Sequence, residues 1–166
     1  IHPSDERRLQ EFFYSHSQET IQMRYGYTVD HMTRQRAYDL VNIDQSKDLA
    51  LGIFEVQGPR ETIHAVGRYY LDKDEKNAEV AFVVRESKRR TGMASVLFSA
   101  MAEVAHKRKI DYLWGRVRKG NLPMLALFKQ YGGKKMPSDS ASDVDIHIPL
   151  PLKQSTKKKK GKIKKE

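Results

Sequence analysis

The sequence has 166 residues, enough for one domain with a sizeable hydrophobic core and little more. It contains no cysteine, which excludes disulfide bonds, thiolate catalysis and cysteine-ligated metal sites. The net charge of +10 arises mostly after residue 152, where eight lysines and one glutamate follow, so the preceding residues carry an ordinary charge.

The end of the chain, KQSTKKKKGKIKKE over residues 153–166, is a separate Lys-rich tail. It has too little apolar surface to fold, so we expect it to be disordered and at most to contact nucleic acid weakly through its charge. No apolar run approaches the roughly 20 residues that cross a bilayer, and no signal-peptide pattern opens the chain. We therefore expect a cytoplasmic protein without membrane contact. The first residue is Ile1 rather than Met, which suggests a piece cut from a longer protein.

Three helices are predicted in the first 43 residues. The first begins after Pro3, with Ser4 as its N-cap, because a side-chain oxygen followed by acidic residues suits a helix start. Ser17 has the same role in a second, shorter helix. The third covers residues 29–43, where apolar residues recur at helical spacing.

The hydrophobic period then changes to that of strands. Residues 48–57 and 62–71 predict two strands joined by a turn at Gly58 and Pro59. The elements expected next are a strand over 78–84, a helix over 94–108, a strand over 111–117, a helix over 121–131 that stops at Gly132, and a strand over 144–150. This order predicts one mixed α/β domain over residues 1–152, with a short βαβ segment.

Two predictions concern packing within these elements. In the helix over 94–108, the apolar stripe expected to face the core comprises Val96, Leu97, Ala100, Met101, Val104 and Ala105. Trp114 is expected to lie in the core of its strand. The six histidines are scattered without the spacing of metal ligands, so no metal site is predicted.

The segment KRRTGMASVL, residues 88–97, places three cations and two small residues directly before a helix. Gly92 lets a ligand approach the backbone closely, and Ala94 keeps the helix entrance narrow. The first N–H groups of a helix lack intrahelical partners and attract phosphate, and arginines add charge-assisted contacts. The segment is typical of a pyrophosphate site, but a plain basic turn before a helix has the same composition. Neither GxxxxGK[ST] nor a complete GxGxxG is present.

The same segment resembles the acetyl-CoA signature [Q/R]-x-x-G-x-[G/A] of the GCN5-related N-acetyltransferase (GNAT) family. VVRES before it and NLPMLALFKQYGG after it resemble the family's central strand exit and late helix. The resemblance extends over residues 1–152 and implies a GNAT-like domain that uses acetyl-CoA, without a metal, to acetylate an amine by direct transfer. The pyrophosphate contacts that it implies come from Arg89, Arg90, Thr91, Gly92, Met93 and Ala94.

The resemblance also implies how the rest of the donor binds. Pantetheine would lie along the strand over 78–84 like an additional strand, against the backbone of Phe82, Val83 and Val84. A backbone N–H in this stretch would stabilise negative charge on the thioester oxygen. Asn121 is a further cofactor candidate, although it can equally be the cap of the following helix.

For catalysis, Glu79 matches the glutamate proposed as general base in the lysine-acetylating branch of the family. A surface position at the end of its strand is the alternative for this residue. Phe128 occupies the place where the family often has a tyrosine acid. A CoA thiol has a pKa on the order of 8–9, like Cys, and needs little help to leave, so activity need not be lost.

A narrower resemblance concerns the acceptor. HSQETIQMRYGY, residues 16–27, is similar to the LSxESxxxRF segment of bacterial protein-lysine acetyltransferase domains, which often occur fused to an acyl-CoA-synthetase-like region. It implies a protein lysine as acceptor, and a lysine on an acyl-CoA synthetase is the candidate that the fusion suggests. Two alternatives stay open: acetylation of a small amine, and a non-catalytic module that senses CoA or binds nucleic acid.

Overall fold

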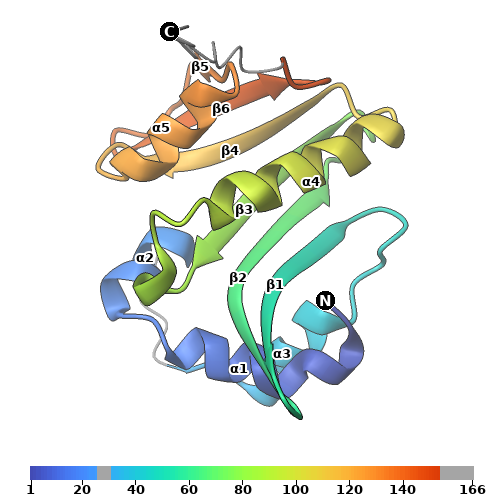
Figure 1. Cartoon of the computed structure of the whole chain (residues 1–166). Helices are drawn as coiled ribbons and strands as arrows, with labels where there is room; N and C mark the ends of the chain where they lie inside the picture. The colour runs from blue at the N-terminus through green and yellow to red at the C-terminus, as the bar shows by residue number, and fades with distance from the viewer. Residues whose placement is uncertain (26–30, 154–166) are drawn as a thin grey trace, which may run out of the picture.

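The computed structural model describes residues 1–25 and 31–153. They form one six-stranded mixed sheet with helices on both faces, which confirms the predicted α/β class (Figure 1). The strands are β1 (Leu49–Gln57), β2 (Arg60–Leu71), β3 (Asn77–Val84), β4 (Tyr112–Arg118), β5 (Lys134–Met136) and β6 (Asp143–Pro149). The helices are α1 (Glu6–Tyr14), α2 (Gln18–Tyr25), α3 (Arg34–Val41), α4 (Met93–Lys107) and α5 (Leu122–Gln130), with short 3-10 helices η1 (Pro3–Asp5) and η2 (Glu86–Lys88).

The strand order is β1-β2-β3-β4-β6-β5, and each neighbouring pair is antiparallel except β3 and β4. The parallel pair is joined by α4, as a βαβ crossover requires. β5 was not predicted, because its three exposed residues, KKM, have no apolar alternation. It pairs with β6 at the edge of the sheet.

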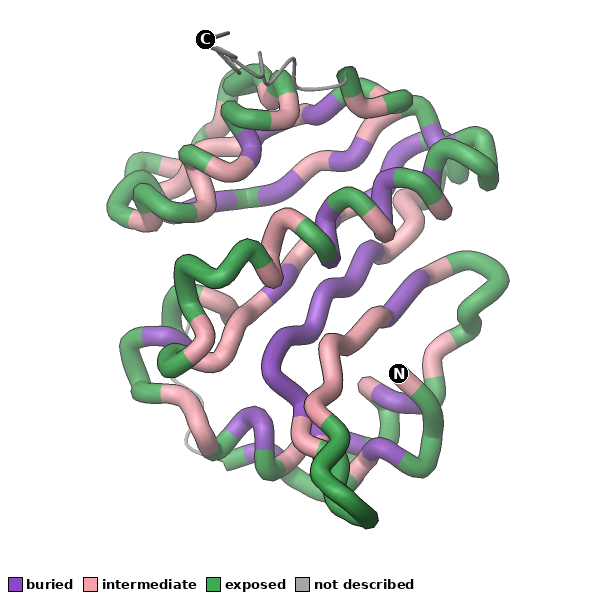
Figure 2. Tube along the Cα trace, viewed as in Figure 1, coloured by how far each residue is buried: buried purple, intermediate pink, exposed green. Residues whose placement is uncertain are grey.

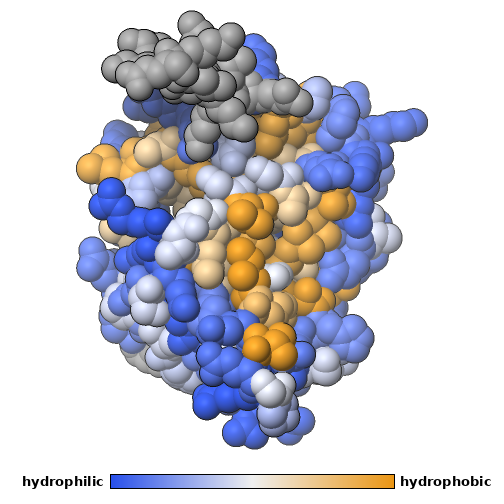
Figure 3. All heavy atoms as spheres, in the orientation of Figure 1, coloured by the Kyte–Doolittle hydropathy of each residue, from blue (hydrophilic) through white to orange (hydrophobic). Residues whose placement is uncertain are grey.

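Two cores lie on opposite faces of the sheet. On one face, α4 and α5 pack through Phe98, Met101 and Phe128 against β3, β4 and β6. On the other face, α1 and α3 pack through Phe12 and Val41 against β2. β2 therefore is buried along most of its length (Figure 2). Figure 3 shows hydrophobic residues gathered at the centre of the face that carries α4, with hydrophilic residues at its margins.

Several local predictions need correction. The cap at the chain start is the side chain of His2, which accepts from the Ser4 backbone N–H, so Ser4 is not the N-cap. Val96 is 62% exposed, and the buried stripe of α4 instead consists of Leu97, Phe98, Met101, Ala102 and Ala105. The predicted stripe was displaced because apolar residues occur on more than one side of this helix.

Two other predicted helix ends are confirmed, and one is wrong. Ser17 caps α2 through its hydroxyl oxygen, which accepts from the Thr20 N–H. α3 begins after a Thr33 cap rather than at residue 29, which lies outside the described residues. Gly132 ends α5 with a φ of 79°, and the Gly133 N–H donates to the Phe128 carbonyl.

Apart from Lys153, the predicted Lys-rich tail also lies outside the described residues. Over residues 1–25 and 31–153, each helix is too short or too polar to cross a membrane. The same residues contain no group of three or more His, Asp or Glu side chains placed to hold a metal ion.

Candidate active site

The site centres on the place where β3 and β4 stop pairing. Their ladder covers only Asn77–Glu79 and Tyr112–Trp114, and both strands continue beyond it. β3 then remains paired with β2 alone, and β4 with β6 alone. Between Val80 and Val84 the outer edge of β3 therefore makes no ladder bond to β4. The N–H and C=O groups of such an edge can bind an extended ligand that contains amides.

The loop predicted to bind pyrophosphate lies between the end of β3 and α4. Gly92 is the residue before α4 and has a left-handed φ of 86°, and Arg90 also has a positive φ, of 61°. A Cβ atom at Gly92 would meet no heavy atom within 4 Å, so the loop is open at this point. No side chain caps the start of α4, which leaves first-turn N–H groups available to an anion. These residues fit a pyrophosphate.

The other loop residues are placed as follows. The Arg89 guanidinium donates from Nη2 to the Thr20 hydroxyl oxygen at 2.6 Å, so its side chain is directed toward α2. The Thr91 hydroxyl donates to the Lys88 carbonyl. Met93 and Ala94 form the first turn of α4, and Ala94 packs against the core. The Arg89 and Thr91 side chains are thus bonded to protein groups, whereas the first-turn N–H groups of α4 have no side-chain cap.

The predicted donor residues of β3 divide between the two faces of the sheet. The side chain of Phe82 is buried against α4 and α5, whereas Val83 packs toward α1 and α3. Backbone contact with a ligand is compatible with both. Asn121 caps α5, since its side-chain oxygen accepts from the Met124 N–H at 3.4 Å. Phe128 is 1% exposed and contacts Phe82 and Phe98 edge-on or tilted, which completes an aromatic cluster in the core.

Glu79 is the last residue of β3 in the ladder with β4, and its Cα partners are Tyr70 on β2 and Trp114 on β4. Its side chain lies on the sheet face opposite α4 and is half-buried. Burial raises the pKa of Glu79, and the charge of Arg24 on α2 opposes this rise. A half-buried carboxylate of raised pKa, beside an open strand edge, can accept a proton.

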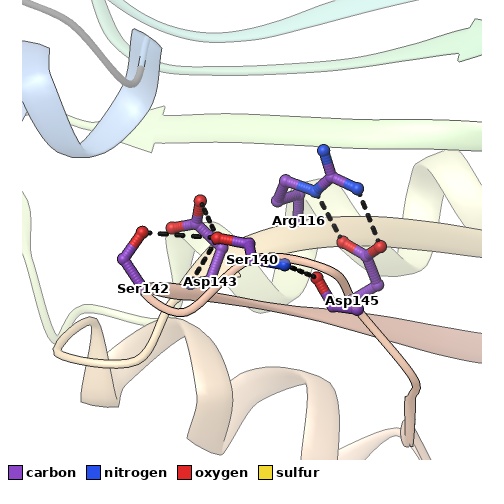
Figure 4. A network of polar contacts seen from close by, with 6 residues as sticks. Arg116, Ser140, Ser142, Asp143 and Asp145 are labelled. Carbon is purple, nitrogen blue, oxygen red and sulfur yellow. Dashed lines mark hydrogen bonds and ion pairs between the residues drawn. The ribbon is translucent and has the colours of Figure 1, made fainter.

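Polar groups that the sequence did not single out surround Glu79. Trp114 is not a core residue: it lies on the Glu79 face, and its indole N–H donates to the Asp72 carboxylate at 2.8 Å. Arg116 forms a bidentate pair with Asp145 at 2.8 and 2.9 Å, as the dashed lines between β4 and β6 show in Figure 4. The strand alternation could have indicated this face, because residues 112, 114 and 116 alternate with buried positions.

The strand that completes this face is held by its preceding loop. In Figure 4, Ser140, Ser142 and Asp143 form a hydrogen-bonded cluster where β6 begins. The Ser140 hydroxyl contacts both the Asp143 carboxylate and the Asp143 N–H. This cluster fixes the start of β6 and so the position of Asp145 opposite Arg116.

The chain was compared with protein families and with solved structures. A family model described as the acetyltransferase (GNAT) domain matches residues 1–134. The chain belongs to the GNAT acetyltransferase family. This confirms the family suggested by the signature at Arg89 to Ala94, and the GNAT fold uses acetyl-CoA as its acetyl donor.

Solved GNAT structures share the fold. The GNAT domain of PAT from S. lividans matches with a TM-score of 0.81 and 23% identity, over 90% of this chain and 88% of that chain. The ribosomal-protein-alanine N-acetyltransferase from Brucella melitensis has a TM-score of 0.69 and 15% identity, with 90% and 97% covered. PaiA N-acetyltransferase from Thermoplasma acidophilum, solved in complex with coenzyme A, has a TM-score of 0.70 and 15% identity, with 90% and 95% covered.

Proposed function

We propose that this GNAT domain transfers the acetyl group of acetyl-CoA directly to the side-chain amine of a protein lysine, with Glu79 as general base. The observation that carries the proposal is the position of Glu79, half-buried at the last residue pair that joins β3 to β4. The carboxylate there is beside the strand edge on which the thioester would lie.

The donor side of the reaction depends on backbone groups. The β3 edge at Phe82, Val83 and Val84 would bind the pantetheine amides, and an N–H in this stretch would hold the thioester oxygen as charge develops. The loop that ends at Gly92 and the first turn of α4 would hold the pyrophosphate.

The acceptor side requires a base. A lysine amine has a pKa of about 10.4 and is protonated at neutral pH, so it must lose a proton before it attacks. Glu79 takes this proton, directly or through one water, and the neutral amine then attacks the thioester carbon. As the N–C bond forms and the C–S bond breaks, the nitrogen loses its second proton to solvent. The sulfur leaves as a thiolate, which is stable enough that the hydroxyl missing at Phe128 is not essential. The raised pKa of Glu79 brings it nearer to the operating pH, which favours general-base catalysis.

The surroundings of Glu79 suit a cationic acceptor. Asp145 neutralises Arg116 through their bidentate pair. Within the described residues, the two carboxylates of Glu79 and of Asp72, which accepts from the Trp114 indole, then outnumber the other cation near Glu79, Arg24. Carboxylates and an indole together favour an alkyl ammonium group. A protein as acceptor is supported by the likeness of residues 16–27 to protein-lysine acetyltransferases and by the S. lividans PAT domain with the same fold. A lysine of an acyl-CoA synthetase is the first acceptor to test.

The test combines acceptor identification with a single substitution. The purified chain is incubated with radiolabelled acetyl-CoA and two panels, one of proteins that includes an acyl-CoA synthetase and one of small amines. We expect label on a protein lysine. Glu79→Gln should lower kcat by about 10²–10⁴-fold with little change in acetyl-CoA affinity. The loss should shrink toward pH 10, where the amine deprotonates without help.

The dependence of kcat/KM on pH provides a second test of Glu79 as the base, since protonation of Glu79 at low pH should lower activity. Because burial raises the pKa of Glu79 above its usual 4.5, the acid limb of kcat/KM should fall at a pH above 4.5 and vanish in Glu79→Gln. Glu103→Gln, on the exposed side of α4, is the matched control and should leave the profile unchanged. Glu79→Gln activity within threefold of wild type at pH 7 would disprove the base role. Label found on small amines alone would disprove the acceptor class.

A further inference from the structure

The loop between β3 and α4, residues 85–92, is here called the donor loop, and one face of α2 lies between this loop and Glu79. The residues on this face are Ser17, Thr20 and Arg24, which are spaced by three and four positions and so project from the same side of the helix. They belong to the segment that resembles protein-lysine acetyltransferases, but none of them has a role in the chemistry described above.

Thr20 uses the whole bonding capacity of its hydroxyl. The oxygen donates to the Glu86 carboxylate at 2.7 Å, accepts from Arg89 Nη2 at 2.6 Å and is 3.2 Å from the Ser17 hydroxyl. A threonine hydroxyl has one proton to donate and two lone pairs, so all three are engaged. The side chain is also buried, with 7% of its surface exposed.

Glu86 and Arg89 both belong to the segment between β3 and α4 that leads to Gly92. Glu86 also accepts from the Ser17 N–H at 2.8 Å, at the start of α2 where the helix dipole favours an anion. These hydrogen bonds lower the pKa of Glu86 to about 2, so the carboxylate is charged throughout the physiological range. The Thr20 hydroxyl thus joins α2 to Glu86 and Arg89, which lie 66 and 69 positions further along the sequence.

Arg24 lies one helical turn beyond Thr20 on α2, and α2 contacts β3, the strand that carries Glu79. Its positive charge is the largest influence that opposes burial in setting the pKa of Glu79. The other groups that face this carboxylate are Asp72 after β2, Arg116 on β4 and Asp145 on β6, with Tyr70 beside it on β2. Of these, Arg24 is the only one supplied by a helix.

We propose that Thr20 is a positioning residue, which fixes α2 to the donor loop through Glu86 and Arg89 and thereby holds Arg24 beside Glu79. The inference rests on the proposed role of Glu79 in catalysis, but the contact itself can be tested without turnover. Loss of the Thr20 hydroxyl should let the start of α2 move away from the loop, and Arg24 should move with it.

The experiment measures the pH at which the Glu79 carboxyl is half protonated, its titration midpoint. Carbon-13 NMR gives this midpoint for the whole chain without ligand. Arg24→Gln should raise the midpoint of Glu79, by up to about one pH unit, because a nearby positive charge is lost. Thr20→Val, which keeps the shape and removes the hydroxyl, should raise it by part of that amount. The double variant should match Arg24→Gln alone, because the two residues act on Glu79 through one contact. Thr20→Ser keeps the hydroxyl and should restore the wild-type midpoint.

Two results would overturn the proposal. One is a Glu79 midpoint that Thr20→Val leaves unchanged while Arg24→Gln moves it. The other is full additivity of the two substitutions. Glu86→Leu removes the exposed partner of Thr20 from the loop side, so it provides the same test if Thr20→Val folds poorly. In the acetylation assay, Glu79→Gln tests the base role by itself, so failure of the proposed function and failure of the Thr20 contact are distinguishable.

Discussion

Gly92 has both a left-handed backbone conformation and open space where a side chain would begin. Its φ of 86° is in the left-handed region that L-amino acids adopt rarely, and the space where a Cβ atom would lie is open. The conformation turns the chain into α4 while leaving the first helical N–H groups accessible. At this scale the sequence predicted a turn that needs glycine, and the structure has one there, whereas the phosphate contact stays a prediction.

Gly92→Glu is therefore expected to abolish acetyl-CoA binding while the fold persists. The side chain would occupy the open space with a negative charge beside the phosphates. Isothermal calorimetry measures the loss, and circular dichroism reports the fold. Gly58→Glu is the matched control, since Gly58 also has a positive φ, of 60°, and an open Cβ position but lies in the β1–β2 turn. Wild-type affinity in Gly92→Glu would show that the phosphate site is elsewhere.

At the scale of elements, α5 and β4 fit each other through a glycine. A Cβ atom at Gly115 would be 2.8 Å from the Phe128 ring, so any larger residue would force the ring or the strand to shift. The close approach accompanies the deep burial of Phe128, which is 1% exposed. The aromatic cluster of Phe82, Phe98 and Phe128 depends on this close approach.

Gly115→Ala should therefore destabilise the protein by about 1–3 kcal/mol, because an overpacked core must shift the Phe128 ring or the strand. Urea denaturation measures the change in the free energy of unfolding. Gly120→Ala, whose Cβ would meet no atom within 4 Å, should change stability by less than about 0.5 kcal/mol. Equal effects of the two substitutions would contradict this explanation.

The elements also show the limits of prediction from sequence. Long elements such as β2 and α4 have clear periods, and their positions were predicted to within about two residues. β5 has only three exposed residues, and it is a strand because β6 supplies a partner, which no local pattern encodes. The contacts of Thr20 and of Trp114 were missed for the same reason, since their partners are distant in the sequence.

At the scale of the whole molecule, most of the excess positive charge lies in the sequence after Leu152. Leu152 still packs against the core beside α5, whereas the lysines begin one residue later. The boundary of the domain at residue 152 stays a prediction from composition.

Truncation after Leu152 should accordingly leave the melting temperature and acetyl-CoA affinity unchanged. The reason is that the removed residues are nearly all polar and cannot contribute hydrophobic burial. Truncation after Pro149 is the control: it removes Leu150 and Leu152, which pack against the core, and should lower the melting temperature. Differential scanning calorimetry compares the two. A clear fall with the first truncation would show that the tail supports the domain.

The short ladder between β3 and β4 has a consequence for how the molecule opens. Three residue pairs and the crossover helix α4 join one half of the sheet, β1-β2-β3, to the other, β4-β6-β5. A donor bound along the β3 edge would act as a seventh strand that links the two halves of the sheet.

Acetyl-CoA at 100 times its Kd should add about 2.7 kcal/mol to the free energy of unfolding. Amide hydrogen exchange should then slow most at residues 80–84 and 115–118, far more than in the β1–β2 turn. Bound acetyl-CoA would thus bridge the β3 and β4 halves of the sheet where ladder hydrogen bonds between the described residues of the two strands are missing.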